Sequence, residues 1–70
     1  MMDLEHRHIS TQQIAQFFEY SHLPSRLQEI SAPLCEVAEQ MIRNCPDSPE
    51  LTFGLRQLLL AKDAFVRAAL

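Results

Sequence analysis

The stretch from Ser48 to Leu70 most constrains the fold, because it predicts a helix with apolar side chains on two faces. Ser48 is a good N-cap, and Pro49 and Glu50 suit the first helical turn. One face carries apolar residues at alternating intervals of four and three, around Lys62 near its centre: Leu51, Leu55, Leu58, Phe65 and Ala69. Phe53 and Leu60 occupy the opposite face. Such a helix needs more than one neighbour, and we expect one neighbour to be a second copy of the chain.

The length of the chain supports this expectation of a homo-oligomer. A single domain of 70 residues has a small core and is only marginally stable alone. Cys35 and Cys45 lack the paired spacing of a zinc site, and on one helix they would lie ~15 Å apart, too far for a disulfide. We therefore expect two reduced cysteines, in a reducing compartment, and stabilisation by assembly.

The net charge of −3 argues against nonspecific binding of duplex nucleic acid, which requires clustered Lys and Arg. The start of the chain, MMDLEHRH, has no apolar run and does not resemble a signal peptide. No stretch approaches the ~20 apolar residues of a membrane span. These features predict a soluble, cytoplasmic protein that does not bind membranes.

The chain in order predicts an all-α fold with a short N-terminal helix followed by a long antiparallel αα-hairpin. We expect a flexible arm over residues 1–9, then a helix over 10–21 that opens with the capping box Ser10–Gln13. A second helix over 25–45 carries a continuous apolar stripe, and Pro33 predicts a kink within it. The third helix covers 49–70, and the short corner before it makes the last two helices antiparallel neighbours.

No catalytic motif is present, so we expect no enzyme and no cofactor. His6 and His8 are two residues apart with no third ligand nearby, and we predict no metal site there.

Several polar and aromatic residues are candidates for binding a ligand, each with an ordinary structural alternative. Lys62 either lays its methylenes on the apolar stripe or reaches an anion in a pocket between subunits. Tyr20 either closes the core or stacks on a flat ligand beside the corner of His22, Leu23 and Pro24. Arg26 is either a surface residue or a cation at that corner.

The second apolar face of the last helix contains charged residues as well. Arg56 and Arg67, with Asp63 four residues before Arg67, form either a solvated stripe or the polar part of an interface. Because Phe53 and Leu60 lie among them, we expect an interface formed by Phe53, Leu60, Arg56 and Arg67.

Several short motifs together resemble one family. The pattern Phe18-x-Tyr20, a corner with proline, Ile30 with Ala38 eight residues on, and Cys45-Pro46-Asp47-Ser48-x-Glu50 resembles the helical-hairpin domain of phage anti-CBASS sponges. The related anti-Thoeris sponge shares this hairpin. The similarity covers roughly residues 18–69.

The resemblance implies a homo-oligomer, a hexamer in anti-CBASS members, that binds cyclic di- or trinucleotides between protomers and releases them unhydrolysed. Tyr20 matches the family tyrosine that stacks on a base. Ser31 stands where the family has a basic residue that meets phosphate, and residues 61–68 also depart from better-known members, so Lys62 or Arg26 would have to compensate. The resemblance thus predicts a phage sponge acting in the host cytoplasm; the alternative is a helical self-assembly or protein-interaction module without a small ligand.

Overall fold

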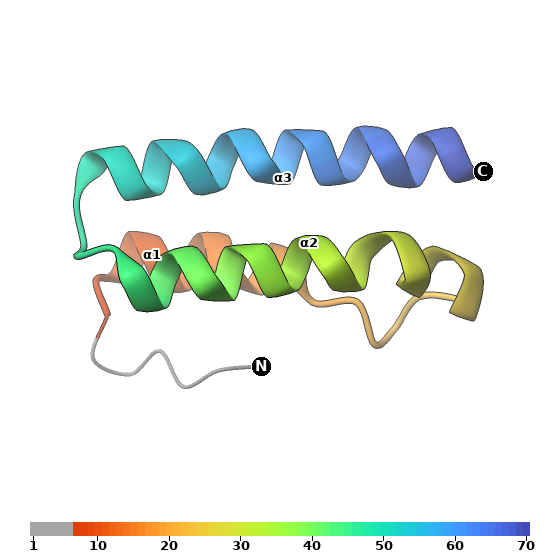
Figure 1. The fold of residues 1–70 in the computed structure, drawn as a ribbon, viewed down its shortest axis with the longest axis horizontal. Coiled ribbons are helices and arrows are strands. Elements are labelled where there is room, and N and C mark those ends of the chain that lie inside the picture. The colour runs from red at the N-terminus through yellow and green to blue at the C-terminus, as the bar shows by residue number, and fades with distance from the viewer. Residues whose placement is uncertain (1–6) are drawn as a thin grey trace.

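The computed structural model describes residues 7–70, which leaves His6 and most of the expected N-terminal arm outside the described part. Helix α1 spans Ile9–Ala15 and continues as the 3-10 helix η1, Gln16–Phe18. Helices α2, Ser25–Asn44, and α3, Pro49–Ala69, follow (Figure 1). The described residues contain no strand, which confirms the predicted all-α class.

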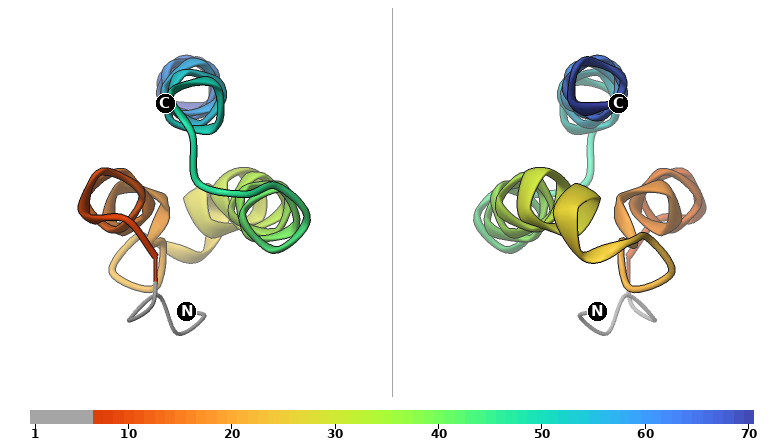
Figure 2. Two further views of the ribbon diagram at one scale, coloured as in Figure 1. Left: turned by 90° about the vertical axis from the view of Figure 1, so that its left-hand side faces the viewer. Right: turned by 90° about the vertical axis from the view of Figure 1, so that its right-hand side faces the viewer.

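The last two helices form the predicted antiparallel hairpin. In Figure 1, α2 runs from the right of the view to the left and α3 returns above it. Seen along the long axis, α1 lies beside α2, and α3 lies over both (Figure 2). The chain thus forms a three-helix arrangement of 34 × 20 × 17 Å.

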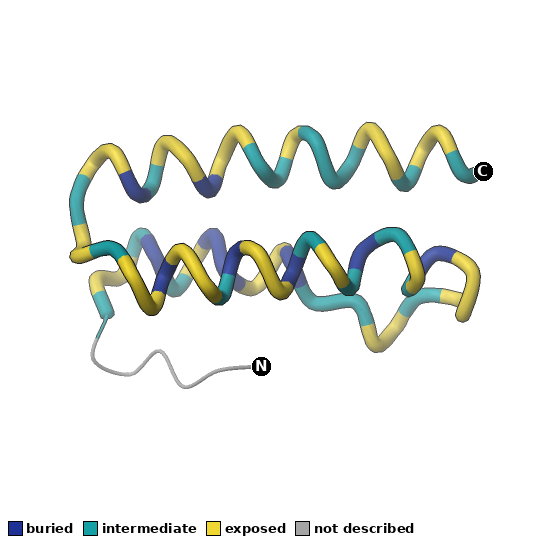
Figure 3. Tube along the Cα trace, viewed as in Figure 1, coloured by how far each residue is buried: buried dark blue, intermediate teal, exposed yellow. Residues whose placement is uncertain are grey.

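The core lies where the three helices face one another (Figure 3). Phe18, Ile42 and Leu55 are at most 2% exposed and are its largest fully covered apolar side chains. Burying side chains of this size contributes roughly 1.5–3 kcal/mol each before entropy costs. The other members of the core cluster are Ile14, Ala15, Cys35, Ala38 and Leu51.

The start of α3 agrees with the cap predicted from the sequence. Ser48 has an extended backbone, and its Oγ accepts a 3.1 Å hydrogen bond from the backbone N–H of Leu51. Pro49 occupies the first turn, where its missing N–H costs nothing. Helix α2 continues through Pro33 as a single helix.

The N-terminal helix differs from the prediction at both ends. It begins at Ile9, and His8 is the N-cap in place of Ser10, because the His8 Nδ1 accepts a 3.1 Å hydrogen bond from the Ser10 N–H. The α-helix ends at Ala15 and the 3-10 turn ends at Phe18, so Tyr20 lies outside the helix. Arg7 and His8, expected in the flexible arm, are held by hydrogen bonds described below.

Candidate ligand-binding cleft

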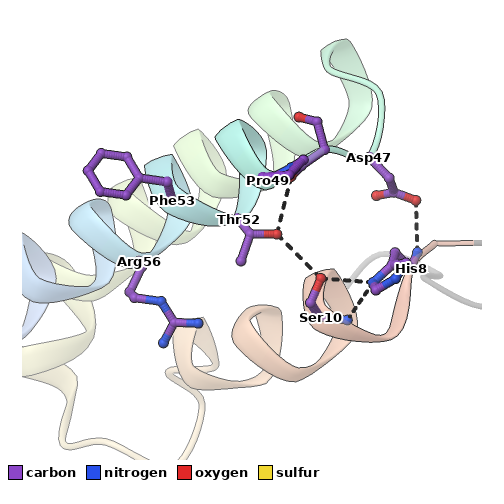
Figure 4. Close-up of a pocket in the computed structure, with 8 residues that line it drawn as sticks. His8, Ser10, Asp47, Pro49, Thr52, Phe53 and Arg56 are labelled. Atoms are coloured by element: carbon purple, nitrogen blue, oxygen red, sulfur yellow. Dashed lines mark hydrogen bonds between the residues drawn. The ribbon is translucent and has the colours of Figure 1, made fainter.

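A cleft of about 540 Å³ lies at the end of the molecule where α1 and α3 begin (Figure 4). The start of α1 supplies part of one wall, and the corner before α3 with the first two turns of α3 supplies the rest. Its lining combines hydroxyls, an imidazole, a carboxylate, a guanidinium and an aromatic ring: His8, Ser10, Asp47, Ser48, Pro49, Thr52, Phe53 and Arg56.

A chain of hydroxyl contacts joins the two sides of this cleft. Ser10 Oγ lies 3.3 Å from Thr52 Oγ1 and 2.9 Å from His8 Nδ1. Thr52 donates its hydroxyl hydrogen to the backbone carbonyl of Ser48, at 3.3 Å. These contacts link α1 and α3 through side chains at the floor of the cleft.

Asp47 fixes the N-terminal segment against the corner between α2 and α3. Its Oδ1 accepts from Arg7 Nε at 3.1 Å and from the Thr11 hydroxyl at 3.0 Å, and its Oδ2 accepts from the His8 backbone N–H at 2.8 Å. The hydrogen bond from His8 contributes most to lowering the pKa of Asp47 below its ordinary value, with further contributions from Thr11 and Arg7. The guanidinium of Arg7 also donates to the Cys45 carbonyl at 2.8 Å.

The contact between Ser10 and His8 functions as a helix cap. In a nucleophile–base–carboxylate triad the carboxylate accepts from the imidazole ring, but Asp47 accepts from the backbone N–H of His8. The ring nitrogen that faces Ser10 also accepts from the Ser10 backbone N–H. The lone pair that a general base would use is thus engaged with the first turn of α1.

Arg56 and Phe53 bring charge and an aromatic surface to the cleft. They lie one helical turn apart on α3, and Phe53 is 59% exposed. In Figure 4 Arg56 extends from α3 toward the first helix, and Phe53 projects from α3 on the other side. Arg56 forms no ion pair with any residue from 7 to 70. A free guanidinium can bind a phosphate in bidentate fashion, and an exposed ring can stack on a base.

The residues predicted to bind a ligand from the first corner lie at the opposite end of the molecule. The corner joins η1 to α2, at the right of Figure 1, whereas the cleft lies where α3 begins. Tyr20 is half-buried against the core and Leu23 is half-buried. His22, Pro24 and Arg26 are exposed.

Lys62 and Ser31, the other two predicted ligand residues, lie on the inward sides of the hairpin. The Lys62 side chain is only 14% exposed, and its Nζ lies 2.9 Å from Asp63 Oδ1. Ser31 is 1% exposed, and its Oγ has no hydrogen-bond partner among the described residues. Neither they nor the corner residues line the cleft or the two other cavities of the hairpin considered below.

The predicted interface residues share the outward side of α3. Phe53 and Leu60 are each 59% exposed, and Arg56 and Arg67 are exposed as well. Two of these four residues, Phe53 and Arg56, also line the cleft.

No sequence pattern marks His8, Ser10 and Thr52 as ligand-binding residues. The sequence predicts Ser10 as a cap and His8 as part of a flexible arm, and their partners Thr52 and Asp47 lie about 40 residues away along the chain. The sequence predicts Ser48 as a helix cap, and Asp47 enters only as part of the family pattern Cys45-Pro46-Asp47-Ser48-x-Glu50.

Three further properties concern the described part of the chain. No group of three or more His, Cys, Asp or Glu side chains between residues 7 and 70 is arranged to hold a metal ion. None of the helices there is both long enough and apolar enough to cross a membrane. Both cysteines are free, as predicted.

The structure therefore belongs to the class of small all-α proteins built on a helical hairpin, with a polar cleft at one end. Comparisons with protein-family models, with curated proteins and with solved structures give no match to the chain.

Proposed function

We propose that this protein is a noncatalytic sponge that binds and sequesters a cyclic di- or trinucleotide immune signal, as phage anti-defence proteins of the resembling family do. In this proposal it acts in the cytoplasm of the host cell as a homo-oligomer, with a hexamer as the expected form. The ligand is held between protomers and released unhydrolysed.

The observation that supports the proposal is the combination of Arg56, Phe53 and the hydroxyls of Ser10 and Thr52 around one cleft. The volume of about 540 Å³ falls within the range of about 300–1,000 Å³ typical of small-molecule sites. A nucleotide has an anionic phosphate for a guanidinium and a flat base for an aromatic ring, so the lining suits its two chemical parts.

The residues at the other end of the molecule would complete the site from a second protomer. Tyr20, His22, Leu23, Pro24 and Arg26 form one exposed to half-buried corner. Lys62 lies near the centre of the inner stripe of α3. A cyclic dinucleotide carries two phosphates and two bases, so cations and rings from two chains would bind it better than those of one chain. This step depends on the family resemblance.

The test is native mass spectrometry of the purified protein with a panel of cyclic di- and trinucleotides, with linear dinucleotides as the comparison. We expect an oligomer that gains discrete nucleotide masses, and the ligand should be recovered intact after denaturation. Failure to gain mass from any cyclic nucleotide, or recovery of a hydrolysed product, would contradict the proposal.

Two matched arginine variants locate the site. Arg56→Ala removes the cation at the cleft, and we expect it to weaken binding by about tenfold or more, as loss of a charge-assisted hydrogen bond would. Arg67→Ala removes another exposed arginine from the same outward side of α3, away from the cleft, and should leave affinity unchanged. Tyr20→Ala and Lys62→Met test the corner and the inner stripe in the same way.

A second candidate function is a self-assembly or protein-interaction module without a small ligand. The exposed apolar side chains on α2 and α3 favour it, since Val37 and Met41 are 40% exposed and Phe65 is 55% exposed. An oligomer that gains no nucleotide mass would support this second function over the first.

A further inference from the structure

The side of the hairpin lined by α2 and α3 alone carries two apolar hollows, which together we call the groove. These two cavities have volumes of about 460 and 440 Å³. No residue of α1 or η1 lines either cavity, because α1 packs on the other side of the hairpin. Glu29 and Glu50 are the only charged residues in the two linings.

The α2 side of the groove carries large apolar residues at heptad spacing. Ile30, Leu34, Val37 and Met41 follow one another at intervals of four, three and four. This is the spacing of a seam that packs against another helix. The inward stripe of α2, from Leu27 to Ile42, is separate from it and already packs in the core. Helix α2 thus has one seam used within the chain and a second one that faces the groove.

The α3 side carries the same spacing but alternates large and small residues. The positions Leu51, Leu58 and Phe65 alternate with Gly54, Ala61 and Ala68, at intervals of three and four. The small positions are seven residues apart, so they lie in line along the helix. Gly54 lines one cavity and Ala68 lines the other, and Ala61 lies between them on the same line of the helix. We call these three small positions the depressions of α3.

Gly54 shows that packing within the protomer does not explain this row. It is the only glycine of the chain, and it lies inside a helix, where glycine is less stable than alanine. A Cβ atom added to Gly54 would meet no atom within 4 Å. The protomer could hold an alanine there, so the missing side chain leaves room for something that approaches α3 from outside.

We propose that a second copy of this chain docks on the groove through its own groove, with a two-fold axis parallel to the helices. This arrangement places α2 of each protomer over α3 of the other. The large residues of one α2 then enter the depressions at Gly54, Ala61 and Ala68 of the partner helix, and the same contact occurs twice. The four helices form an antiparallel bundle with a continuous core.

The shape of the groove favours this partner and this axis. A two-fold axis across the helices would put α2 on α2 and α3 on α3. The large residues of α2 would then face one another, and the depressions of α3 would face one another. The seam from Leu51 to Ala68 is ~25 Å long, and two helices are ~20 Å wide, so each protomer covers roughly 500 Å². The total of roughly 1,000 Å² reaches the lower bound for a specific interface.

This interface specifies how two protomers of the proposed oligomer contact each other, and it does not require a nucleotide. The test is the association state by sedimentation velocity over a range of protein concentrations. We expect dimers or multiples of dimers for the natural chain, and a monomer for the double variant Val37→Lys, Met41→Lys with unchanged helical circular dichroism. Leu60→Lys changes an apolar residue that is 59% exposed on the outward side of α3 and lines neither the cleft nor the groove, and in this inference it leaves the groove dimer intact.

Gly54→Ala keeps the test decisive if the lysine variants fail to fold. In a chain whose groove stays open, the alanine raises the melting temperature and has no other effect. In the dimer it fills a depression, and we expect the dissociation constant to rise by about tenfold or more. A natural chain that stays monomeric at high concentration, or association that is unchanged by Gly54→Ala and by the lysine pair, would overturn the inference.

The two proposals fail separately in these experiments. An oligomer that gains nucleotide mass, and whose association is unchanged by Gly54→Ala and by the lysine pair, would refute the groove dimer and leave the sponge proposal standing. A dimer that depends on the groove but gains no nucleotide mass would refute the proposed nucleotide binding and support the proposed interface.

Discussion

The carboxylate of Asp47 lies 2.8 Å from the backbone nitrogen of His8, although the two residues are 39 positions apart in the chain. The same carboxylate accepts from Arg7 and Thr11. One side chain thus joins the start of α1 to the corner between α2 and α3. Asp47 also lines the cleft that lies between these parts.

Asp47→Asn should lower the thermal stability of the protein and loosen α1 in particular. The amide keeps the size of the carboxylate but loses its charge toward Arg7 and one of its acceptor oxygens. The melting temperature and the hydrogen exchange of the α1 amides report the two effects. Glu36→Gln, on the exposed side of α2, is the control and should change neither. Faster exchange across the whole chain, with no preference for α1, would contradict this local role.

Stability should fall in acid because of the same residue. The pKa of Asp47 is lowered in the folded protein, chiefly by the hydrogen bond from the His8 N–H. The unfolded chain therefore binds a proton at higher pH than the folded chain, and this stabilisation is present above about pH 4 and lost as the pH falls through the folded value. Urea midpoints measured from neutral to acid pH should decline, and less steeply for Asp47→Asn. Equal slopes for both chains would assign acid sensitivity to other carboxylates.

Two buried hydroxyls should respond to removal with opposite signs. Thr11 and Ser31 are each 1% exposed, but Thr11 donates to Asp47 at 3.0 Å and the Ser31 Oγ has no partner among residues 7–70. Thr11→Val should therefore cost about 1 kcal/mol of unfolding free energy, and Ser31→Ala should be neutral or stabilising by up to about 1 kcal/mol. Chemical denaturation measures both. Clear destabilisation by Ser31→Ala would mean that its hydroxyl has a partner, such as a bound water or a ligand.

The elements could be predicted from the sequence because their signals are local. Ser48 and Pro49 indicate the start of α3, and the apolar stripes predict both hairpin helices, although Val37, Met41 and Phe65 of these stripes are exposed in the protomer. The cleft could not be predicted, since Asp47 meets Arg7, His8 and Thr11 through contacts 36 to 40 residues apart that leave no periodic pattern.

The end of the first helix shows a second limit of local reasoning. The sequence places no strong breaker between Ala15 and Pro24, and a helix to residue 21 was expected. The structure tightens the chain into a 3-10 turn at Gln16–Phe18, where Phe18 is 1% exposed in the core. The helix ends where the Phe18 ring packs into the core, and helix propensity alone does not predict this end.

The two cysteines should differ strongly in their reaction with alkylating reagents. Burial raises the pKa of the Cys35 thiol to about 11, helped by its contact with Glu39 Oε1 at 3.4 Å. Few Cys35 thiols are then ionised at pH 8, and only the thiolate reacts. In a Cys45→Ser chain, Cys35 should react on the order of 100-fold more slowly in buffer than in urea, as followed by mass spectrometry.

Cys45 provides the contrasting measurement in a Cys35→Ser chain. It is half-buried and lines the groove beside Met41 and Gly54, so a reagent reaches it in the protomer but not in the proposed dimer. Its alkylation should slow as the protein concentration rises, whereas that of Cys35 in the Cys45→Ser chain should not change. Concentration-independent alkylation of Cys45 in an associated protein would place the contact between chains elsewhere, with the outward side of α3 as the next surface to test. A fast reaction of Cys35 in buffer would show that the core around Ala38 and Ile42 opens more readily than its burial implies.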